Sequence, residues 1–390
     1  MRIWHLFAVA CSIACFASNA SAQRAATFFG LGDLPGGDEN SVATAMTGDG
    51  RAVVGFSLAG GGFPGLYEGF RWTHEDGMIG IGTLPGGNET QAYGISANGR
   101  HVVGNGISSQ GLQAFLWTEG VGIQGLGKPD GATSTSARSV SMGGSVVVGR
   151  VHYPGRTEAF RWTPESGMVG LGTLPGMTSS IAVGVSSDGT VIGGSSSGQT
   201  DGRGFLWTAQ DGMIDLGKPE GWKSVIALGF SANGNALVGN GYTGTRIEAF
   251  RWTPDEGMIG LGVLYDAAPL SSAHAVSPDG EYVVGRSNAG LREEAFVWSE
   301  EWGMRSVRSV LLDAGIDLTA LNWSIGSADG VTVVGNTLII SGTGWNHTPN
   351  RQEAWMAHIP IPAPASLAPL LLAAPVVARR RRQGRCASLP

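Results

Sequence analysis

Short apolar runs separated by glycine turns recur along almost the whole chain. Segments such as Glu158–Trp162 alternate in character, which is the period of a strand with two different faces. Valine runs such as Val146–Val148, and segments that open with Gly-Met such as Gly167–Leu171, predict further strands. Ala273–Ser277 exemplifies one more strand, which precedes the turn. Each unit of the pattern therefore predicts four short strands.

These units repeat in a fixed register. One tryptophan recurs at steps of 45 or 46 residues, at Trp72, Trp117, Trp162, Trp207, Trp252 and Trp298. A turn glycine recurs at Gly50, Gly99, Gly144, Gly189, Gly234, Gly280 and Gly330, and a second glycine follows five residues later, at Gly55, Gly104, Gly149, Gly194, Gly239, Gly285 and Gly335. Asp or Asn precedes the turn glycine in six of the seven units, which is a strong hairpin signal. The chain therefore contains seven units.

Four strands in a repeat of about 45 residues predict an all-β, seven-bladed β-propeller. The seventh unit stops at its third strand, Glu353–Met356, whereas Thr27–Gly32 resembles the fourth strand Gly77–Gly82. We therefore expect an N-terminal strand to complete the last blade and close the ring, which removes open sheet edges. A β-solenoid is the alternative, but it gives no reason for this offset. A short helix is expected near Val307–Ala314.

The third strand predicts how blades stack. Alternation places Glu158, Phe160 and Trp162 on one face and Ala159 and Arg161 on the other, so the large rings of one blade can fill the space over the alanine of the next. The arginine position is occupied by leucine or valine in other units, at Leu116, Leu206 and Val297. We therefore interpret Arg71, Arg161 and Arg251 as packing residues.

Composition supports a folded β-protein. Glycine accounts for 64 of 390 residues, charged residues for 14 % and hydrophobic residues for 42 %, which suits many strands joined by tight turns. The cysteines, Cys11, Cys15 and Cys386, lie near the ends, so the predicted propeller (23–359) has no disulfide and no cysteine metal site. Between the terminal segments, 19 basic residues oppose 31 acidic ones, a net charge of −12 that disfavours nucleic-acid binding.

The N-terminus predicts export. Arg2, an apolar run over Leu6–Ala17 and the Ala20–Ala22 triplet have the layout of a signal peptide, residues 1–22, with cleavage near Ala22. A lipoprotein signal at Cys11 is the alternative, but the apolar run before it is short.

The C-terminus predicts sorting. A proline-rich linker (360–366) precedes an apolar and basic tail (367–390). The tail's apolar part is too short for a stable membrane anchor. The order resembles the PEP-CTERM sorting signals of bacterial surface proteins, with Ala363 where that family usually has glutamate. The resemblance implies processing by an exosortase-type enzyme and only transient membrane contact, through Pro362, Ala363, Pro364, Arg379, Arg380, Arg381 and Arg382.

The repeats resemble a known family as well. Glu158–Trp162, the Asp279-Gly280 turn with Val283–Gly285, and the Gly-Met fourth strands are similar to the HAF-repeat family of probable extracellular bacterial repeat proteins. The resemblance covers roughly residues 27–356 and implies an extracellular location. It carries no catalytic motif to transfer.

Candidate chemistry is sparse. Gly194–Gly198 matches G-x-S-x-G, but we interpret it as the composition of a glycine-serine loop, because a nucleophile elbow needs a strand, a turn and a helix. The histidines have no metal-binding spacing, and the Asp-Gly pairs are explained by turn chemistry without calcium. We therefore expect no cofactor, no metal and no catalytic residue.

The loops between second and third strands are the remaining candidates. Aromatic and polar residues gather there, which favours a carbohydrate or protein ligand; they are His152, Tyr153, Tyr242, Trp345 and His347. The sequence thus favours a non-catalytic binding or structural module at the cell surface, with an extracellular glycan or surface protein as partner. The alternative is a propeller hydrolase or lyase that acts on an extracellular polysaccharide, which would need paired carboxylates or a nucleophile with its base.

Overall fold

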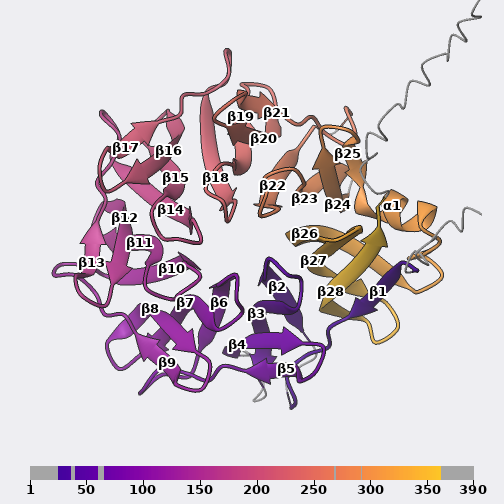
Figure 1. Ribbon diagram of the computed structural model, residues 1–390, viewed down its shortest axis with the longest axis horizontal. Helices are drawn as coiled ribbons and strands as arrows, with labels where there is room; N and C mark the ends of the chain where they lie inside the picture. The colour runs from indigo at the N-terminus through magenta and orange to yellow at the C-terminus, as the bar shows by residue number, and fades with distance from the viewer. Residues whose placement is uncertain (1–24, 37–39, 60–65, 268, 291, 362–390) are drawn as a thin grey trace, which may run out of the picture.

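The computed structural model describes residues 25–361 except 37–39, 60–65, 268 and 291. These residues form seven four-stranded antiparallel sheets arranged as blades around a central axis (Figure 1). The predicted seven-bladed propeller is confirmed. The predicted signal peptide and sorting residues lie outside the described residues. No helix in the described part of the chain is long and apolar enough to cross a membrane.

Each blade is a meander whose first strand lies nearest the axis. The strands of blades 1 to 3 are β2 (Ser41–Met46), β3 (Ala52–Ala59), β4 (Leu66–Thr73), β5 (Gly77–Gly80); β6 (Thr90–Ile95), β7 (His101–Ser108), β8 (Gly111–Thr118), β9 (Gly122–Gly125); and β10 (Ser134–Val140), β11 (Val147–Tyr153), β12 (Arg156–Thr163), β13 (Gly167–Gly170).

The remaining blades follow the same order. Their strands are β14 (Ser179–Val185), β15 (Ile192–Ser197), β16 (Gly202–Thr208), β17 (Gly212–Asp215); β18 (Ser224–Phe230), β19 (Leu237–Tyr242), β20 (Ile247–Thr253), β21 (Gly257–Gly260); β22 (Ser271–Val276), β23 (Val283–Ala289), β24 (Arg292–Ser299), β25 (Gly303–Ser306); and β26 (Trp323–Val334), β27 (Thr337–Asn346), β28 (Arg351–Pro360) with β1 (Thr27–Gly30). In blade 7 the fourth strand is β1, from the start of the chain.

The two repeated glycines have different physical roles. Gly50 closes the turn between β2 and β3 with φ +69°, a conformation that favours glycine. Gly55 lies within β3, where a Cβ atom would meet the carbonyl oxygen of Val42 at 1.8 Å. The first glycine therefore permits the turn, and the second permits the close approach of the first two strands.

The core lies between the blades, as the third-strand pattern predicts. Phe160 of blade 3 is fully buried and packs in one cluster with Ala114 and Leu116 of blade 2. Ala159, on the opposite face of the same strand, packs with Phe205 of blade 4. A fully buried Phe side chain contributes about 1.5–3 kcal/mol, so each seam between blades is a substantial part of the stability.

A buried hydroxyl also bridges neighbouring blades. The Thr90 hydroxyl of blade 2 donates to the Gly82 carbonyl at 2.9 Å and accepts from the Gly69 amide of blade 1 at 3.1 Å. Glu68 in turn accepts a hydrogen bond from the Gly82 amide. The same hydroxyl bridge recurs at other seams through Ser41, Thr135, Ser180 and Ser271.

The chain ends meet at a seam of the same construction. β1 pairs antiparallel with β28, from Thr27 opposite His358 to Gly30 opposite Trp355. Glu353 accepts the Gly32 amide at 3.0 Å, as Glu68 accepts the Gly82 amide in blade 1. Closure by an N-terminal strand is therefore confirmed.

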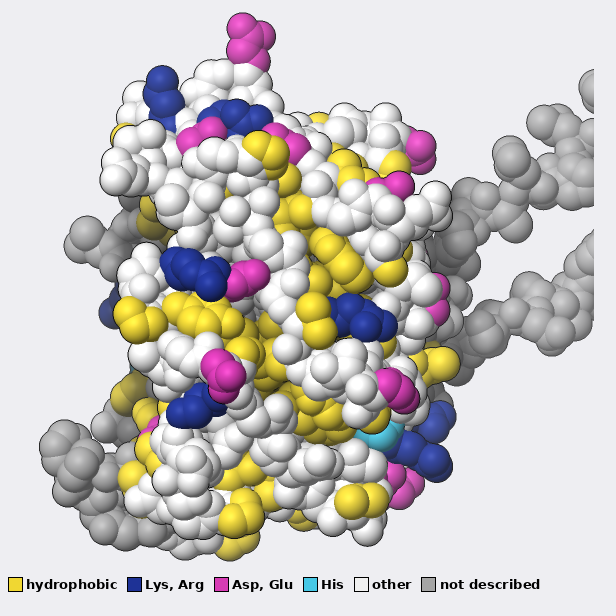
Figure 2. Space-filling view, turned by 90° about the vertical axis from the view of Figure 1, so that its left-hand side faces the viewer, with side chains coloured by type: hydrophobic (Ala, Val, Ile, Leu, Met, Phe, Trp, Pro, Cys, Tyr) yellow, Lys and Arg dark blue, Asp and Glu magenta, His cyan; other side chains and the backbone are white. Residues whose placement is uncertain are grey.

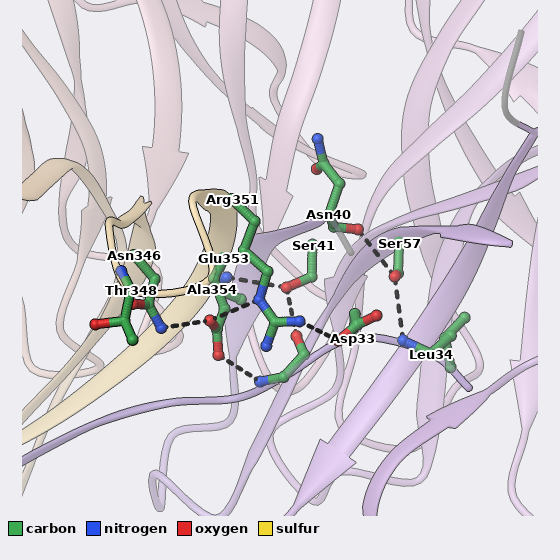
Figure 3. Close-up of polar contacts among 11 residues, drawn as sticks. Asp33, Leu34, Asn40, Ser41, Ser57, Asn346, Thr348, Arg351, Glu353 and Ala354 are labelled. Atoms are coloured by element: carbon green, nitrogen blue, oxygen red, sulfur yellow. Dashed lines mark hydrogen bonds and ion pairs between the residues drawn. The ribbon is translucent and has the colours of Figure 1, made fainter. Parts of the chain in front are cut away.

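Figure 3 shows the polar contacts that surround this seam. Arg351 pairs with both Glu353 and Asp33, at 3.0 and 2.9 Å, and so links the last full strand of the chain to the segment after β1. Ser41 bridges the Gly32 carbonyl and the Ala354 amide. The first blade is thereby bound to the last by the contacts that join the others.

Blade 7 departs from the predicted register. Asp329-Gly330 lies inside β26 and not in a turn, whereas Gly335 has φ +59° and lies in the connection to β27. Gly342 takes the place of the strand glycine, because its Cβ would meet the Ser327 carbonyl oxygen at 2.1 Å and the Trp355 ring at 2.8 Å. The alignment of Gly330 and Gly335 with the other units is therefore wrong.

The cause is that β26 is longer than the other first strands and carries two register shifts instead of one. The predicted helix is present as α1 (Val307–Asp313), capped by Ser306. Its buried residues Val307, Val310 and Leu311 join the core of blade 7.

Candidate functional site

A β-bulge in the first strand of each blade turns one side chain toward the axis. In blade 3 the pairing of β10 with β11 skips Arg138, which lies between the paired residues Ala137 and Ser139. A bulge leaves one residue unpaired and redirects its side chain. The corresponding residues are Thr44, Tyr93, Arg138, Val183, Leu228, His274 and Asp329, and all of them line one central cavity.

A second set of side chains comes from the second strands. The residue after the close-approach glycine faces the same cavity in six blades: Phe56, Arg150, Ser195, Asn240, Arg286 and Thr343. The cavity measures about 1120 Å³, and first strands of all seven blades contribute to its wall. That volume is slightly above the roughly 300–1,000 Å³ of typical small-ligand sites.

One part of the wall is cationic. Arg138 and Arg150 come from adjacent strands of blade 3, and the guanidinium of Arg138 lies 4.4 Å from the ring centre of Tyr93 in blade 2. Within the described part of the chain neither arginine side chain has an ion pair or a hydrogen bond, and Nε of Arg150 is buried without a partner. Burial, and then the charge of Arg150, lower the pKa of Arg138.

The neighbouring blades 4 and 5 present apolar side chains to the same cavity. Ile226 and Leu228 are 50 % and 40 % exposed although both belong to an inner strand, β18. Ile181 and Val183 of β14 occupy the corresponding positions beside blade 3. An apolar surface therefore adjoins the two arginines.

The opposite part of the wall contains polar groups that are paired with each other. His274 Nδ1 of blade 6 lies 2.8 Å from Asp329 Oδ1 of blade 7, and the Ser327 hydroxyl donates to the other carboxylate oxygen. Arg286 pairs with Glu293. Among the described residues no hydroxyl is hydrogen-bonded to Nε2 of His274, so this group lacks the nucleophile of a catalytic triad.

The five predicted loop residues do not form one cluster. Trp345 lines the central cavity, and its Nε1 donates to Asn350; the other four are not part of the cavity wall. His152 and Tyr153 lie at the end of β11, where the guanidinium of Arg156 covers the Tyr153 ring at 4.3 Å.

Tyr242 and His347 make local contacts in blades 5 and 7. The Tyr242 hydroxyl donates to the Gly244 carbonyl at 2.8 Å, and His347 Nε2 lies 3.1 Å from the Ser324 hydroxyl. A shared ligand site on these loops stays a prediction.

The Gly194–Gly198 motif is placed differently from the prediction. Ser196 lies in strand β15 and not in a loop, and it is fully buried. Its hydroxyl donates to the Ser179 carbonyl and accepts the Leu174 amide. Small residues suit this strand because a Cβ on Gly194 would meet the Ile181 carbonyl oxygen at 2.2 Å. Ser196 is therefore a structural residue.

The repeated arginines pack between blades and add a hydrogen bond. Arg251 Nε donates to the Gly280 carbonyl of the next blade at 2.9 Å, and Arg71 makes the same bond to Gly99. In the described structure this bond is present for Arg71 and Arg251 and not for Arg161. The predicted packing role therefore holds, with an additional polar contact at two of the three positions.

The outer wall differs from the cavity. Figure 2 looks onto the left-hand side of Figure 1, where basic and acidic side chains are scattered among apolar ones. Fourth strands expose single apolar residues there and elsewhere, such as Val169 and Ile214.

Among the described residues no group of three or more His, Cys, Asp or Glu side chains could hold a metal ion.

Known proteins share the fold but little sequence. No model of a protein family matches the chain, and no curated protein matches it either. Oligogalacturonate lyase from Vibrio parahaemolyticus is similar at 11 % identity over 86 % of this chain and 98 % of its own, with a TM-score of 0.52. An oligogalacturonate lyase in complex with manganese has 12 % identity, 86 % and 97 % coverage, and a TM-score of 0.51.

TolB from Acinetobacter baumannii is also similar, at 13 % identity and a TM-score of 0.49. The match covers 66 % of this chain and spans 63 % of that protein. At these identities the similarities with the two lyases establish the fold alone: this chain is a β-propeller protein.

Apart from Trp345, the cavity residues are the ones that sequence reasoning missed. The sequence does contain a signal for these residues. In each first strand one position lies between two small residues, and it varies from blade to blade, as Thr44, Tyr93, Arg138 and His274 show, while its neighbours stay small. Simple strand alternation cannot identify such a residue, since a bulge changes the face to which it points.

Proposed function

We propose that this protein is an exported binding module whose ligand occupies the central cavity. The observation that carries the proposal is the wall of that 1120 Å³ cavity, where the apolar side chains of blades 4 and 5, among them exposed Ile226 and Leu228, follow the two arginines of blade 3. Among the described residues neither arginine has an ion pair or a hydrogen bond, and Nε of Arg150 is buried. Apolar side chains exposed to water and unpaired buried donors both cost free energy, and a ligand that covers them removes both costs.

Ligand arrays of glycans and peptides test this proposal when probed with matched variants. Leu228→Trp fills the cavity from β18, whereas Tyr242→Ala removes an aromatic ring from the predicted loop face of the same blade. We expect binding to be lost in the first variant and kept in the second. The reverse result would move the site to the loops.

Export and surface sorting belong to the proposal too. They rest on the signal-peptide layout of residues 1–22, on the resemblance to HAF repeats, and on the PEP-CTERM-like tail with Arg379–Arg382. Basic residues resist translocation and hold the tail at the inner membrane for an exosortase-type enzyme. Mature protein from the cell surface or medium should lack the residues after about Ser366. Intact-mass measurement tests this, and a retained C-terminus would refute processing.

One observation favours a second function, hydrolysis or cleavage of an extracellular polysaccharide. His274 and Asp329 form a hydrogen-bonded pair inside the cavity, and such a pair can serve as a general base. Release of reducing ends from polysaccharides, lost in His274→Ala, would favour catalysis over binding alone.

A further inference from the structure

We infer that the central cavity binds a carboxylate that carries an apolar group, with Arg138 and Arg150 on the carboxylate and the side chains of blades 4 and 5 on the apolar part. The inference rests on the proposed binding function and names the class of ligand for the same cavity.

The first step concerns the charge of the two arginines. Several other arginines of the described chain that are shielded from water have acidic partners, as Arg251 does with Glu256 and Arg351 does with Asp33. Arg138 and Arg150 have no acidic partner among the described residues. Two guanidiniums on neighbouring strands repel each other, and their charge raises the cost of burial. An anion is the ligand class that compensates both.

The second step concerns geometry. Arg138 is the bulge residue of β10, and Arg150 is paired with Ser136 in the same sheet, so the two side chains leave the blade close together. The Tyr93 ring lies against Arg138 and fixes its guanidinium without accepting its N–H groups. Those N–H groups remain available, and guanidinium groups match a carboxylate in shape and charge.

The third step concerns the apolar part of the ligand. The inner strands of blades 4 and 5 carry Ile181 and Val183, then Ile226 and Leu228, at the positions where blade 3 carries Ser136 and Arg138. These apolar residues line the same cavity. A ligand anchored at Arg138 therefore extends along an apolar wall, which favours an aliphatic group over a hydroxylated one.

The other basic residues of the cavity wall are less suited to bind an anion. Arg292 lies at the exposed start of β24. Arg286 Nε is buried without a partner in the described structure, but Nη1 of the same side chain is already paired with Glu293, and His274 is hydrogen-bonded to Asp329. An anion there would have to compete with a carboxylate of the protein. An anion therefore gains the most binding free energy beside the two arginines of blade 3.

Calorimetric titration of the full chain with octanoate and with octanamide tests the inference, because the two probes share the apolar chain and differ in charge. We expect octanoate to bind at least tenfold more tightly than octanamide. Its affinity should fall as sodium chloride is raised, while that of octanamide should not. This comparison needs no variant, so it stands even where a substitution impairs folding.

Variants then locate the two halves of the site. Arg138→Gln with Arg150→Gln should reduce octanoate affinity to that of octanamide and leave octanamide binding within about twofold. Arg51→Gln, on a turn with an 87 % exposed side chain, removes a surface charge as the control and should change neither. Leu228→Asn should weaken both probes.

Three results would overturn the inference. They are equal affinities for octanoate and octanamide, unchanged octanoate binding in the double variant, or tighter binding of galacturonate, a carboxylate on a hydroxylated body. Each leaves the proposed function intact if the array ligand still depends on the cavity. Loss of that dependence would instead refute the binding function itself.

Discussion

Removing residues 23–33 should destabilise the propeller far more than removing an ordinary edge strand. The truncation deletes β1, which fills the outer position of blade 7 by pairing with β28. Leu31 is only 6 % exposed and belongs to the cluster that joins blade 7 to blade 1. Phe28 packs against both Trp323 and Trp355, with ring centroids 5.2 and 5.7 Å apart.

The structure permits an order-of-magnitude value for the loss. Burial of Leu31 contributes about 2 kcal/mol, and the half-buried Phe28 and Phe29 about 1 kcal/mol each. The Gly32–Glu353 and Leu31–Ala354 hydrogen bonds add about 1 kcal/mol each or slightly more. The sum of about 6 kcal/mol compares with a total stability of about 5–15 kcal/mol for a typical protein. The truncated ring should therefore be close to unfolding.

Thermal and urea melts of the full chain and the truncation measure this loss. At about 2–4 °C per kcal/mol, the melting temperature should fall by more than 10 °C. Leu31→Ala should give an intermediate loss of about 2–5 kcal/mol, and Thr27→Ala, at an exposed position, should have little effect. A truncation that melts within about 2 °C of the full chain would refute the reasoning that closure of the ring carries stability.

Three further predictions follow from single side chains. Arg161→Leu should change stability by less than about 1.5 kcal/mol, because leucine fills this position in other blades. Arg251→Leu should cost more, since it breaks a 2.9 Å hydrogen bond to the next blade. Urea denaturation compares the two variants, and equal losses would contradict the different roles given to the two arginines. Trp355→Phe should cost less than about 3 kcal/mol in the same assay, because the buried Nε1 has no partner among the described residues and six blades carry phenylalanine there. A larger loss would refute this. Burial, and then the charges of Arg150 and Arg138, lower the pKa of His152. The contribution of His152 to stability is therefore complete above the ordinary pKa of about 6.5 and falls as the pH drops below that value. NMR titration should find the pKa of His152 raised toward the ordinary value in Arg150→Gln, and an unchanged pKa would contradict the electrostatic account.

The architecture could be predicted from the sequence because the same residue types recur at the same positions of each unit. Phe160 recurs as phenylalanine in six blades, and glycines such as Gly55 recur where two strands touch. Each unit needs a neighbour to cover its two faces, so the number of units sets the number of blades. Even the closure was visible, because Thr27–Gly32 repeats the pattern of a fourth strand and the seventh unit lacks one.

The seventh blade shows where this reasoning ends. Asp329-Gly330 has the same letters as the turns of three other units, but β26 is extended and bulged twice, so the pair lies within the strand. A dipeptide specifies a turn only where the strand length before it is unchanged. Strand length depends on pairing with β27 across the sheet, which is a property of the tertiary structure.

The cavity was decided by the tertiary structure alone. Arg138, Tyr93 and Leu228 are far apart in sequence, and each occupies a bulge that reverses the face expected from alternation. Only the closed ring brings such residues from different blades to one axis. That Arg138 has no acidic partner among the described residues depends in addition on every neighbouring side chain in space, and no spacing along the chain reports it. The sequence by itself therefore determined the blades and their stacking, while the chemistry at their centre emerged only when seven bulges met.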